Sequence, residues 1–275
     1  MYKSQAEKRE ARRKAFGDFL RSRRERLTPA AVGLPAGFRR RTPGLRREEV
    51  ALLAGVGTAW YTWLEQGRDV RPSADVLSAL AVALMLSPDE RRHLFTLADR
   101  SFLNADTFNS SETVPDALIR MIDGMKAQPA YVLGRRWDIL AWNAAAVHVF
   151  GDFGQLEGDA RNMMHLIFTS ERHRNLLKDW NEVAQLSLAM FRADSALYVG
   201  DTDFERLIGL LMENSAEFFA WWPRQDVVQQ PSTVKRIQHP SEGLLEFEYL
   251  NLDVTQSPGM RFIVCTPRMV SGHGD

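Results

Sequence analysis

The segment RREEVALLAGVGTAWYTWLEQGR, residues 46–68, contains two short helical patterns separated by a tight turn. Apolar residues recur at helical spacing within residues 45–54 and predict a first helix. Gly55-Val56-Gly57 predicts the turn, because glycine allows the backbone to change direction sharply. Residues 58–66 predict a second short helix, which Gly67 ends.

Two helices joined by so short a turn are typical of a helix-turn-helix, in which the second helix enters the major groove of DNA. The helical period alone leaves two orientations for this second helix. One orientation buries Trp60, Trp63 and Leu64, whereas the other buries Tyr61, Leu64 and Glu65. The aromatic side chains are therefore candidates both for the core and for contacts with DNA.

The chain has 35 basic and 35 acidic residues, but these charges are unevenly distributed. Residues 1–100 hold 20 Lys and Arg against 12 Asp and Glu, whereas residues 101–275 hold 15 against 23. A basic half joined to an acidic half indicates a nucleic-acid-binding module with a separate partner domain. A solvated, charged helix surface is the alternative explanation for the basic excess.

The residues around the helix-turn-helix predict a compact all-α domain of five short helices. The first is expected over residues 5–27, with an apolar stripe and arginine-rich flanks. Glycines and prolines predict a loop over residues 28–43, which carries Arg39-Arg40-Arg41. Two more helices are expected to begin at Pro72-Ser73 and at Ser87-Pro88, since proline is tolerated in a first helical turn.

The second half of the chain predicts an α+β domain with about five antiparallel strands and several helices. Asn143 is expected to cap a helix that runs to Phe150, and longer helices are expected over residues 171–195 and 203–222. The predicted strands cover residues 130–133, 137–142, 233–239, 244–252 and 260–266. The expected domains are an all-α domain at 1–103, a linker at 104–114, an α+β domain at 115–270 and a tail at 271–275.

Several classes of protein do not fit the composition, which is 45% hydrophobic and 25% charged. The single cysteine, Cys265, rules out an intrachain disulfide and a cysteine-based zinc site. The sequence has no HExxH, glycine-rich phosphate-loop or GxSxG motif, so we predict no metal, cofactor or catalytic residues. The chain also lacks a signal-peptide pattern and any apolar run long enough to span a bilayer, so we expect a cytoplasmic protein without a membrane partner.

Residues 46–56 resemble the start of the repressor-like helix-turn-helix family, and Leu64-Glu65-Gln66-Gly67-Arg68 matches the helix-ending pattern of that family. Over nearly its full length, the chain is identified as a member of the MmyB-like regulators. This wider resemblance rests on residues 19–27, 43–51, 60–68, 137–143, 179–180 and 235–240. It implies a helix-turn-helix domain joined to a PAS-like domain that binds a small apolar ligand, with fatty acids as the leading candidate.

The resemblance favours the orientation that buries Tyr61 and Leu64 and implies a set of DNA contacts. Side chains on the opposite side of the recognition helix would then contact base edges: Thr58, Ala59, Thr62 and Trp63. Basic side chains beside that helix would contact phosphates: Arg46, Arg47, Arg68 and Arg71. We expect Trp60 to pack against the arginine-rich loop.

Apolar side chains of the PAS-like domain are the candidates for a ligand pocket, since such pockets are mostly apolar. The predicted lining residues are Trp137, Ile139, Phe150, Phe168, Phe191, Phe247, Tyr249 and Phe262. The alternative is that these residues simply fill a close-packed core.

The chain departs from the family pattern at three positions. Gly57 stands where relatives carry Ser or Thr as the cap of the recognition helix, which predicts a slightly looser start to that helix. Phe219 and Gln225 stand near positions where relatives often carry Arg and His. Polar ligand contacts from these two positions are therefore not expected in this chain.

We therefore expect a sequence-specific DNA-binding regulator that recognises a double-stranded operator and is modulated by a fatty-acid-like ligand. The first alternative is a constitutive, dimeric DNA-binding protein whose second domain is a ligand-free scaffold. A less favoured alternative is an enzyme with an autoregulatory DNA-binding domain, whose candidate residues would be His165, His173, Asp179 and Glu182. A homodimer is expected in any case, because one recognition helix reads only a few base pairs.

Overall fold

The computed structural model describes residues 4–35, 44–98, 112–226 and 234–268. The chain forms two compact units. The first unit comprises Met1–Asn104, Arg192–Arg206 and Pro223–Gln229, and the second comprises Ala105–Phe191, Leu207–Trp222 and Gln230–Asp275. Two segments from the second half of the sequence thus belong to the first unit. Most of the expected linker and the whole expected tail lie outside the described residues.

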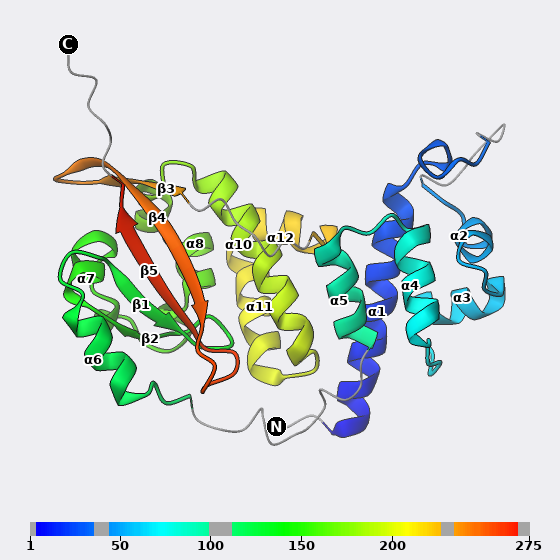
Figure 1. Cartoon of the computed structure of the whole chain (residues 1–275), viewed down its shortest axis with the longest axis horizontal. Coiled ribbons are helices and arrows are strands. Elements are labelled where there is room, and N and C mark those ends of the chain that lie inside the picture. The colour runs from blue at the N-terminus through cyan, green and yellow to red at the C-terminus, as the bar shows by residue number, and fades with distance from the viewer. Residues whose placement is uncertain (1–3, 36–43, 99–111, 227–233, 269–275) are drawn as a thin grey trace, which may run out of the picture. The chain divides into compact units, whose positions relative to one another are not determined.

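Five α-helices form the N-terminal part of the first unit, as the sequence predicts (Figure 1). They are α1 (Gln5–Arg26), α2 (Arg47–Leu53), α3 (Thr58–Glu65), α4 (Ala74–Ala83) and α5 (Pro88–Ala98), with the short 3-10 helix η1 (Pro29–Val32) after α1. Helix α1 starts at a capping box, in which the Glu7 amide donates to the Ser4 hydroxyl over 3.2 Å. The Ser73 hydroxyl caps α4 by accepting from the Val76 amide. The Arg39–Arg41 stretch lies outside the described residues, so its contact with Trp60 stays a prediction.

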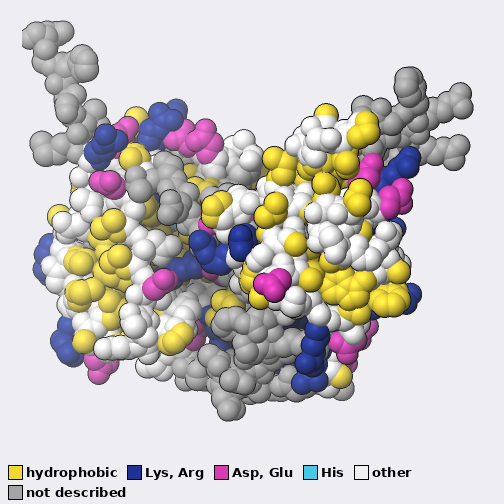
Figure 2. All heavy atoms as spheres, turned by 45° about the vertical axis from the view of Figure 1, so that its right-hand side comes forward, with side chains coloured by type: hydrophobic (Ala, Val, Ile, Leu, Met, Phe, Trp, Pro, Cys, Tyr) yellow, Lys and Arg dark blue, Asp and Glu magenta, His cyan; other side chains and the backbone are white. Residues whose placement is uncertain are grey.

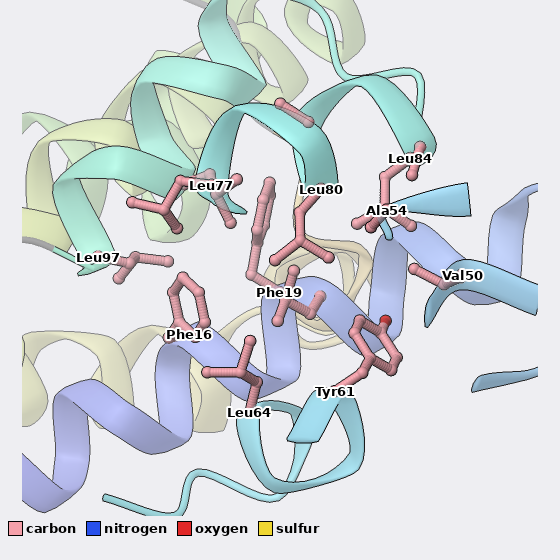
Figure 3. Close-up of a cluster of buried hydrophobic side chains, with 14 of the residues drawn as sticks. Phe16, Phe19, Val50, Ala54, Tyr61, Leu64, Leu77, Leu80, Leu84 and Leu97 are labelled. Atoms are coloured by element: carbon pink, nitrogen blue, oxygen red, sulfur yellow. The ribbon is translucent and has the colours of Figure 1, made fainter. Parts of the chain in front are cut away.

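The core of the first unit joins α1 to both helices of the helix-turn-helix. Figure 3 shows buried side chains from α1, α3 and α4 in one cluster, among them Phe19, Tyr61 and Leu80, each fully buried. Helix α1 approaches the end of α3 closely at Gly17. A Cβ atom at this position would lie only 2.5 Å from the Glu65 carbonyl oxygen, so a larger residue would not fit there. The position of α3 is therefore fixed by its packing against α1 as well as by the turn before it.

The two later segments of the first unit are attached to α1 and α5. The Arg12 guanidinium donates to the Leu97 carbonyl over 3.2 Å and to the Ala196 carbonyl over 3.4 Å. Arg26 pairs with Asp226 at 2.6 Å, and Ser22 donates to the Arg224 carbonyl. Both segments are thus bonded to α1, the long helix that packs against the helix-turn-helix.

The second unit contains a five-stranded, fully antiparallel sheet in the order β2-β1-β5-β4-β3, which confirms the predicted α+β domain (Figure 1). The strands are β1 (Ala130–Leu133), β2 (Ile139–Trp142), β3 (Val234–His239), β4 (Gly243–Asp253) and β5 (Arg261–Pro267).

Strand register divides the side chains of the sheet between two faces. Tyr131 pairs with Ile263, and Tyr249 pairs with Cys265, so these four side chains share one face. On the opposite face, Ala130, Val132, Phe262 and Val264 form a separate buried cluster with Ile122.

In the described part of the chain, seven helices precede or separate the strands of this sheet along the sequence. They are α6 (Asp116–Gly124), α7 (Ala144–Phe150), α8 (Met163–Thr169), α9 (Glu171–Leu176), α10 (Trp180–Ser195), α11 (Thr202–Asn214) and α12 (Ala216–Trp221), with 3-10 helices at η4 (Phe153–Gln155), η5 (Gly158–Arg161), η6 (Ala196–Tyr198) and η7 (Trp222–Arg224). The ends of α10 and α11 that adjoin η6 belong to the segment counted with the first unit. The predicted cap of α7 is confirmed, since the Asn143 side chain accepts from the Ala146 amide over 2.9 Å.

Two long predicted helices are each broken in the structure. Residues 171–195 form α9 and α10, because Leu177 bridges to Ile237 of β3 and the Lys178 amide donates to the Arg236 carbonyl. Residues 203–222 form α11 and α12, because the Ser215 hydroxyl caps a new helix by accepting from the Phe218 amide. Helices α6 and α8 were not predicted.

Candidate nucleic-acid interface and ligand cavity

Helix α3 adopts the second of the two orientations allowed by its helical period. Tyr61, Leu64 and Glu65 are buried, whereas Thr58 and Ala59 are exposed. Thr62 is half-buried, and its hydroxyl donates to the Thr58 carbonyl over 2.8 Å. Trp63 is 40% exposed. The outer side of α3 thus offers two threonines, an alanine and an indole ring to a partner.

A buried ion pair holds α3 in this orientation. The completely buried Glu65 carboxylate accepts from Arg24 of α1 at 2.8 and 2.9 Å and from Arg47 of α2 at 2.9 Å. Burial alone would raise the pKa of Glu65, but the hydrogen bonds and charges of Arg24 and Arg47 hold it below its usual value. Arg24 also donates to the Leu45 carbonyl just before α2. One carboxylate therefore joins three helices.

The predicted phosphate contacts fall into two groups. Arg46, Arg68 and Arg71 are exposed, and Arg46 lies 3.5 Å from the exposed Glu48. Arg47 is half-buried and gives its guanidinium to Glu65. The first three arginines are available to a polyanion, whereas Arg47 has a structural partner as well.

The first unit also exposes large hydrophobic side chains outside α3. Leu52 of α2 is 74% exposed, and Val82 and Met85 at the end of α4 are 73% and 58% exposed. Figure 2 shows hydrophobic side chains gathered on the surface of this unit. Exposed apolar surface of this kind is typical of protein contacts.

A cavity of about 70 Å³ lies in the second unit between the sheet and helices α8 and α10. Its helical side consists of Met163, Ile167, Val183, Leu186, Ser187 and Met190. Its sheet side consists of Tyr131, Leu133, Lys235, Tyr249, Asn251, Arg261 and Ile263, together with Trp137 from the β1–β2 turn. An apolar wall facing a few polar groups is the usual composition of a small-molecule site.

The polar groups of the cavity differ in their partners. The Lys235 ammonium lies 4.0 Å from the centre of the Tyr249 ring, and burial lowers its pKa to about 8. Arg261 lies 5.8 Å from the centre of the Trp137 ring and 3.8 Å from the exposed Asp253. Burial raises the pKa of Tyr131 and Tyr249 far above the normal value, so both hydroxyls are neutral.

Of the eight predicted ligand-binding residues, Trp137 and Tyr249 line the cavity. Trp137 adopts a left-handed backbone conformation, with φ of 66°, which is costly for a bulky residue, at the turn between β1 and β2. Phe191 lies directly behind it, with the two rings edge to face at 5.8 Å. These three form the part of the prediction that the structure brings together.

The other five predicted residues do not line this cavity. Ile139 is buried in the core, and Phe150 packs edge to face on Tyr131. Phe168 belongs to an aromatic cluster with Trp180, Phe218 and Trp221. Phe247 lines an open surface groove, and Phe262 lies on the opposite face of the sheet. A one-residue shift along β5 changes the face, so apolar character alone did not separate lining from core.

Neither position of departure from the family lies at the cavity. Phe219 is 61% exposed on α12. Gln225, with φ of 57°, gives its carbonyl oxygen to Arg23 of α1 within the first unit. The cavity of this chain is therefore built without either side chain.

Two of the side chains considered as catalytic candidates, Asp179 and His173, have surroundings that suit a structural role. Asp179 accepts two hydrogen bonds from Arg236, at 2.7 and 2.5 Å. Burial lowers the pKa of His173 to about 4, so its ring is neutral. Among the described residues, no group of three His, Cys, Asp or Glu side chains is arranged to hold a metal ion. In the same part of the chain, no helix combines the length and apolarity required to cross a bilayer.

Sequence comparisons agree with this two-part architecture. Residues 15–94 match the model of a helix-turn-helix domain. Residues 114–273 match the model of the MmyB-like transcription regulator ligand binding domain. A search of curated proteins found no match. The chain therefore belongs to the MmyB-like transcription regulators, as a DNA-binding regulator with an N-terminal helix-turn-helix and a C-terminal ligand-binding domain.

Proposed function

We propose that a small, largely apolar ligand of the fatty-acid type binds in the cavity of the second unit and modulates DNA binding. The observation that carries this proposal is the cavity itself, with its apolar helical wall and its few polar groups on the sheet. The antiparallel five-stranded sheet supports the proposal that this domain is PAS-like.

The cavity is small, so a ligand is expected to enter only when the side chains that line it move apart. A volume of about 70 Å³ exceeds the ~10–15 Å³ that one water molecule requires, but it is small for a long acyl chain. Met163 and Met190 lie in the apolar wall, and methionine side chains adapt readily to a new neighbour. A ligand is therefore expected to enlarge the cavity between the sheet and helices α8 and α10.

The chain offers a covalent route from the cavity to the DNA-binding unit. Val183, Leu186 and Met190 of α10 line the cavity, and the chain immediately after them, Arg192–Arg206, is counted with the first unit. Within that unit, the Ala196 carbonyl accepts from Arg12 of α1. A change in α10 can therefore reach the helix that positions α3.

For the DNA interface, we propose that α3 enters the major groove with its outer side. Thr58, Ala59, Thr62 and Trp63 would contact base edges. Arg46, Arg68 and Arg71 would contact phosphates, and Arg47 would do so only as far as its pairing with Glu65 permits.

We further propose that the regulator binds its operator as a homodimer. Two recognition helices on half-sites one helical turn apart give the specificity that one helix lacks. The exposed Leu52, Val82 and Met85 support a protein contact on the first unit. Light scattering of the free and DNA-bound protein tests this, and a monomeric mass in both states would reject it.

The ligand proposal is tested by native mass spectrometry of the purified protein followed by denaturing release. A co-purifying acyl compound that changes the affinity for promoter DNA in fluorescence anisotropy is the expected result. Salt-sensitive DNA binding that no released or added acyl compound alters would favour the constitutive scaffold, which the small volume of the cavity also fits.

A further inference from the structure

The cavity of the second unit has an excess of positive charge. Two cationic side chains, Lys235 and Arg261, are among its lining residues, and no aspartate or glutamate is among the described residues that line it. Arg261 has an acidic neighbour, because Asp253 lies 3.8 Å away at the edge of the sheet. Within the described chain, no acidic side chain takes the corresponding place beside Lys235.

Lys235 is directed to the cavity by the register of the sheet. It pairs with Phe247 of β4, so it shares a face with Tyr249, and its ammonium lies over the ring of Tyr249 at 4.0 Å. The neutral hydroxyls of Tyr131 and Tyr249 and the buried thiol of Cys265 belong to the same face. Lys235 is half-buried, and a ring face and neutral dipoles compensate the charge of its ammonium only in part.

We infer that Lys235 is the specificity-determining residue of the cavity and selects a ligand with an anionic head group, such as a carboxylate, over a neutral ligand of the same length. This inference rests on the proposed function, since it assigns a charge to the polar end of the proposed apolar ligand. A carboxylate beside Lys235 would supply the missing counter-charge, and its chain would lie along Met163, Val183 and Met190. Arg261, already paired with Asp253, contributes to the same positive field.

The protonation of Lys235 gives the selection a pH dependence. The titratable or charged groups on the same face of the sheet are Tyr131, Tyr249, Cys265 and Arg261, and the helical side of the cavity contributes none. Burial raises the pKa of the Cys265 thiol to about 12, so Lys235 is the one of these groups that titrates near neutrality. Preference for the anion is expected to decrease as the pH rises past about 8, the pKa of Lys235.

The test measures the binding of octanoate and octan-1-ol to the full-length protein by calorimetry. We expect octanoate to bind about tenfold more tightly or better, the change that one charge-assisted hydrogen bond produces. Lys235→Met is expected to remove this preference without weakening octan-1-ol, whereas Lys235→Arg is expected to keep it. Lys126→Met is the matched control, since Lys126 lines a separate open groove.

Each outcome has a defined meaning. Equal binding of octanoate and octan-1-ol to the unmodified protein overturns the role of Lys235 but leaves the apolar ligand site standing. Binding of neither compound overturns the proposed ligand site, and this inference with it. A preference for octanoate that persists in Lys235→Met, or that is unchanged between about pH 7 and pH 9.5, assigns the selection to another cation and rejects Lys235.

Discussion

Glu65 brings a negative charge into the packed interior of the first unit, where Arg21, Arg24 and Arg47 lie within 3.5 Å of its carboxylate. Arg24 and Arg47 hold it at 2.8 to 3.0 Å, from the helices on either side of α3. We predict that Glu65→Gln lowers the free energy of unfolding by about 3–5 kcal/mol, because the buried Arg24 loses its counter-charge. Urea denaturation at pH 7 measures this change.

The pH dependence of the same substitution gives a second measurement. The pKa of Glu65 is lowered in the folded chain, so its stabilising contribution is complete above the unfolded pKa of about 4.3 and is lost as the pH falls below it. The difference in stability between the unmodified protein and Glu65→Gln should therefore shrink between pH 6 and pH 3. Glu48→Gln, at an exposed position of α2, should change stability by less than about 0.5 kcal/mol. Equal effects of the two substitutions would show that the buried pair contributes little.

The roles proposed for Thr58 and Arg68 allow base recognition to be tested separately from phosphate contact. Thr58→Ala is expected to weaken binding to the operator by about 1–3 kcal/mol and to relax the base preference at one position. Arg68→Ala is expected to weaken binding to operator and random DNA alike and to reduce the salt slope by about one unit. Anisotropy titrations at several salt concentrations measure both. A uniform loss from Thr58→Ala would show that this hydroxyl does not contact bases.

At the scale of the element, the turn before α3 contains two glycines with different backbone conformations. Gly57 caps α3 with φ of −68°, and no neighbour would obstruct a side chain there. We predict that Gly57→Ser stabilises the fold by a few tenths of a kcal/mol, because a hydroxyl caps the first amides of the helix. Gly55 has φ of 65° in equally open space, so Gly55→Ala is expected to destabilise by about 1 kcal/mol. Thermal denaturation compares the two, and a loss in both would mean that the turn tolerates no side chain.

Helical periodicity and capping residues made the five N-terminal helices of the first unit predictable from sequence, but not the two later segments that belong to it. Gly67, Ser73 and the apolar repeat of α4 mark their helices locally, and the structure confirms all five. The break between α9 and α10 was not predictable in this way, because it depends on Leu177 and Lys178 bonding to β3, about 60 residues later in the chain.

The cavity was only partly predictable for a related reason. Aromatic character identified Trp137 and Tyr249, but it also selected Phe262, which the register of β5 places on the other face. The sequence does not mark Lys235 as a site residue, because nothing local shows that a strand lysine faces inward. Only the pairing of β3 with β4 shows that it does.

At the scale of the whole molecule, regulation requires that the cavity and α3 influence one another. The segment Pro223–Gln229 is part of the first unit, and Asp226 in it pairs with Arg26 of α1 at 2.6 Å. Ser22 and Arg23 of the same helix donate to carbonyls of this segment. The C-terminal half of α1 is therefore bonded to a piece of the ligand-binding domain's own sequence. We propose that this bonded segment contributes to coupling between the two sites.

We predict that Asp226→Asn reduces the effect of an acyl ligand on DNA affinity, because Arg26 loses its charged partner and the segment is held less firmly to α1. Typical coupling changes an affinity about 5–150-fold, and a reduction of that factor by about threefold or more is expected. Anisotropy titrations with and without saturating octanoate measure the factor. Asp75→Asn is the control, since Asp75 is exposed on α4 and lies outside both of the later segments of the first unit. An unchanged factor in Asp226→Asn would place the coupling elsewhere, with the α10 segment that bonds to Arg12 as the next path to test.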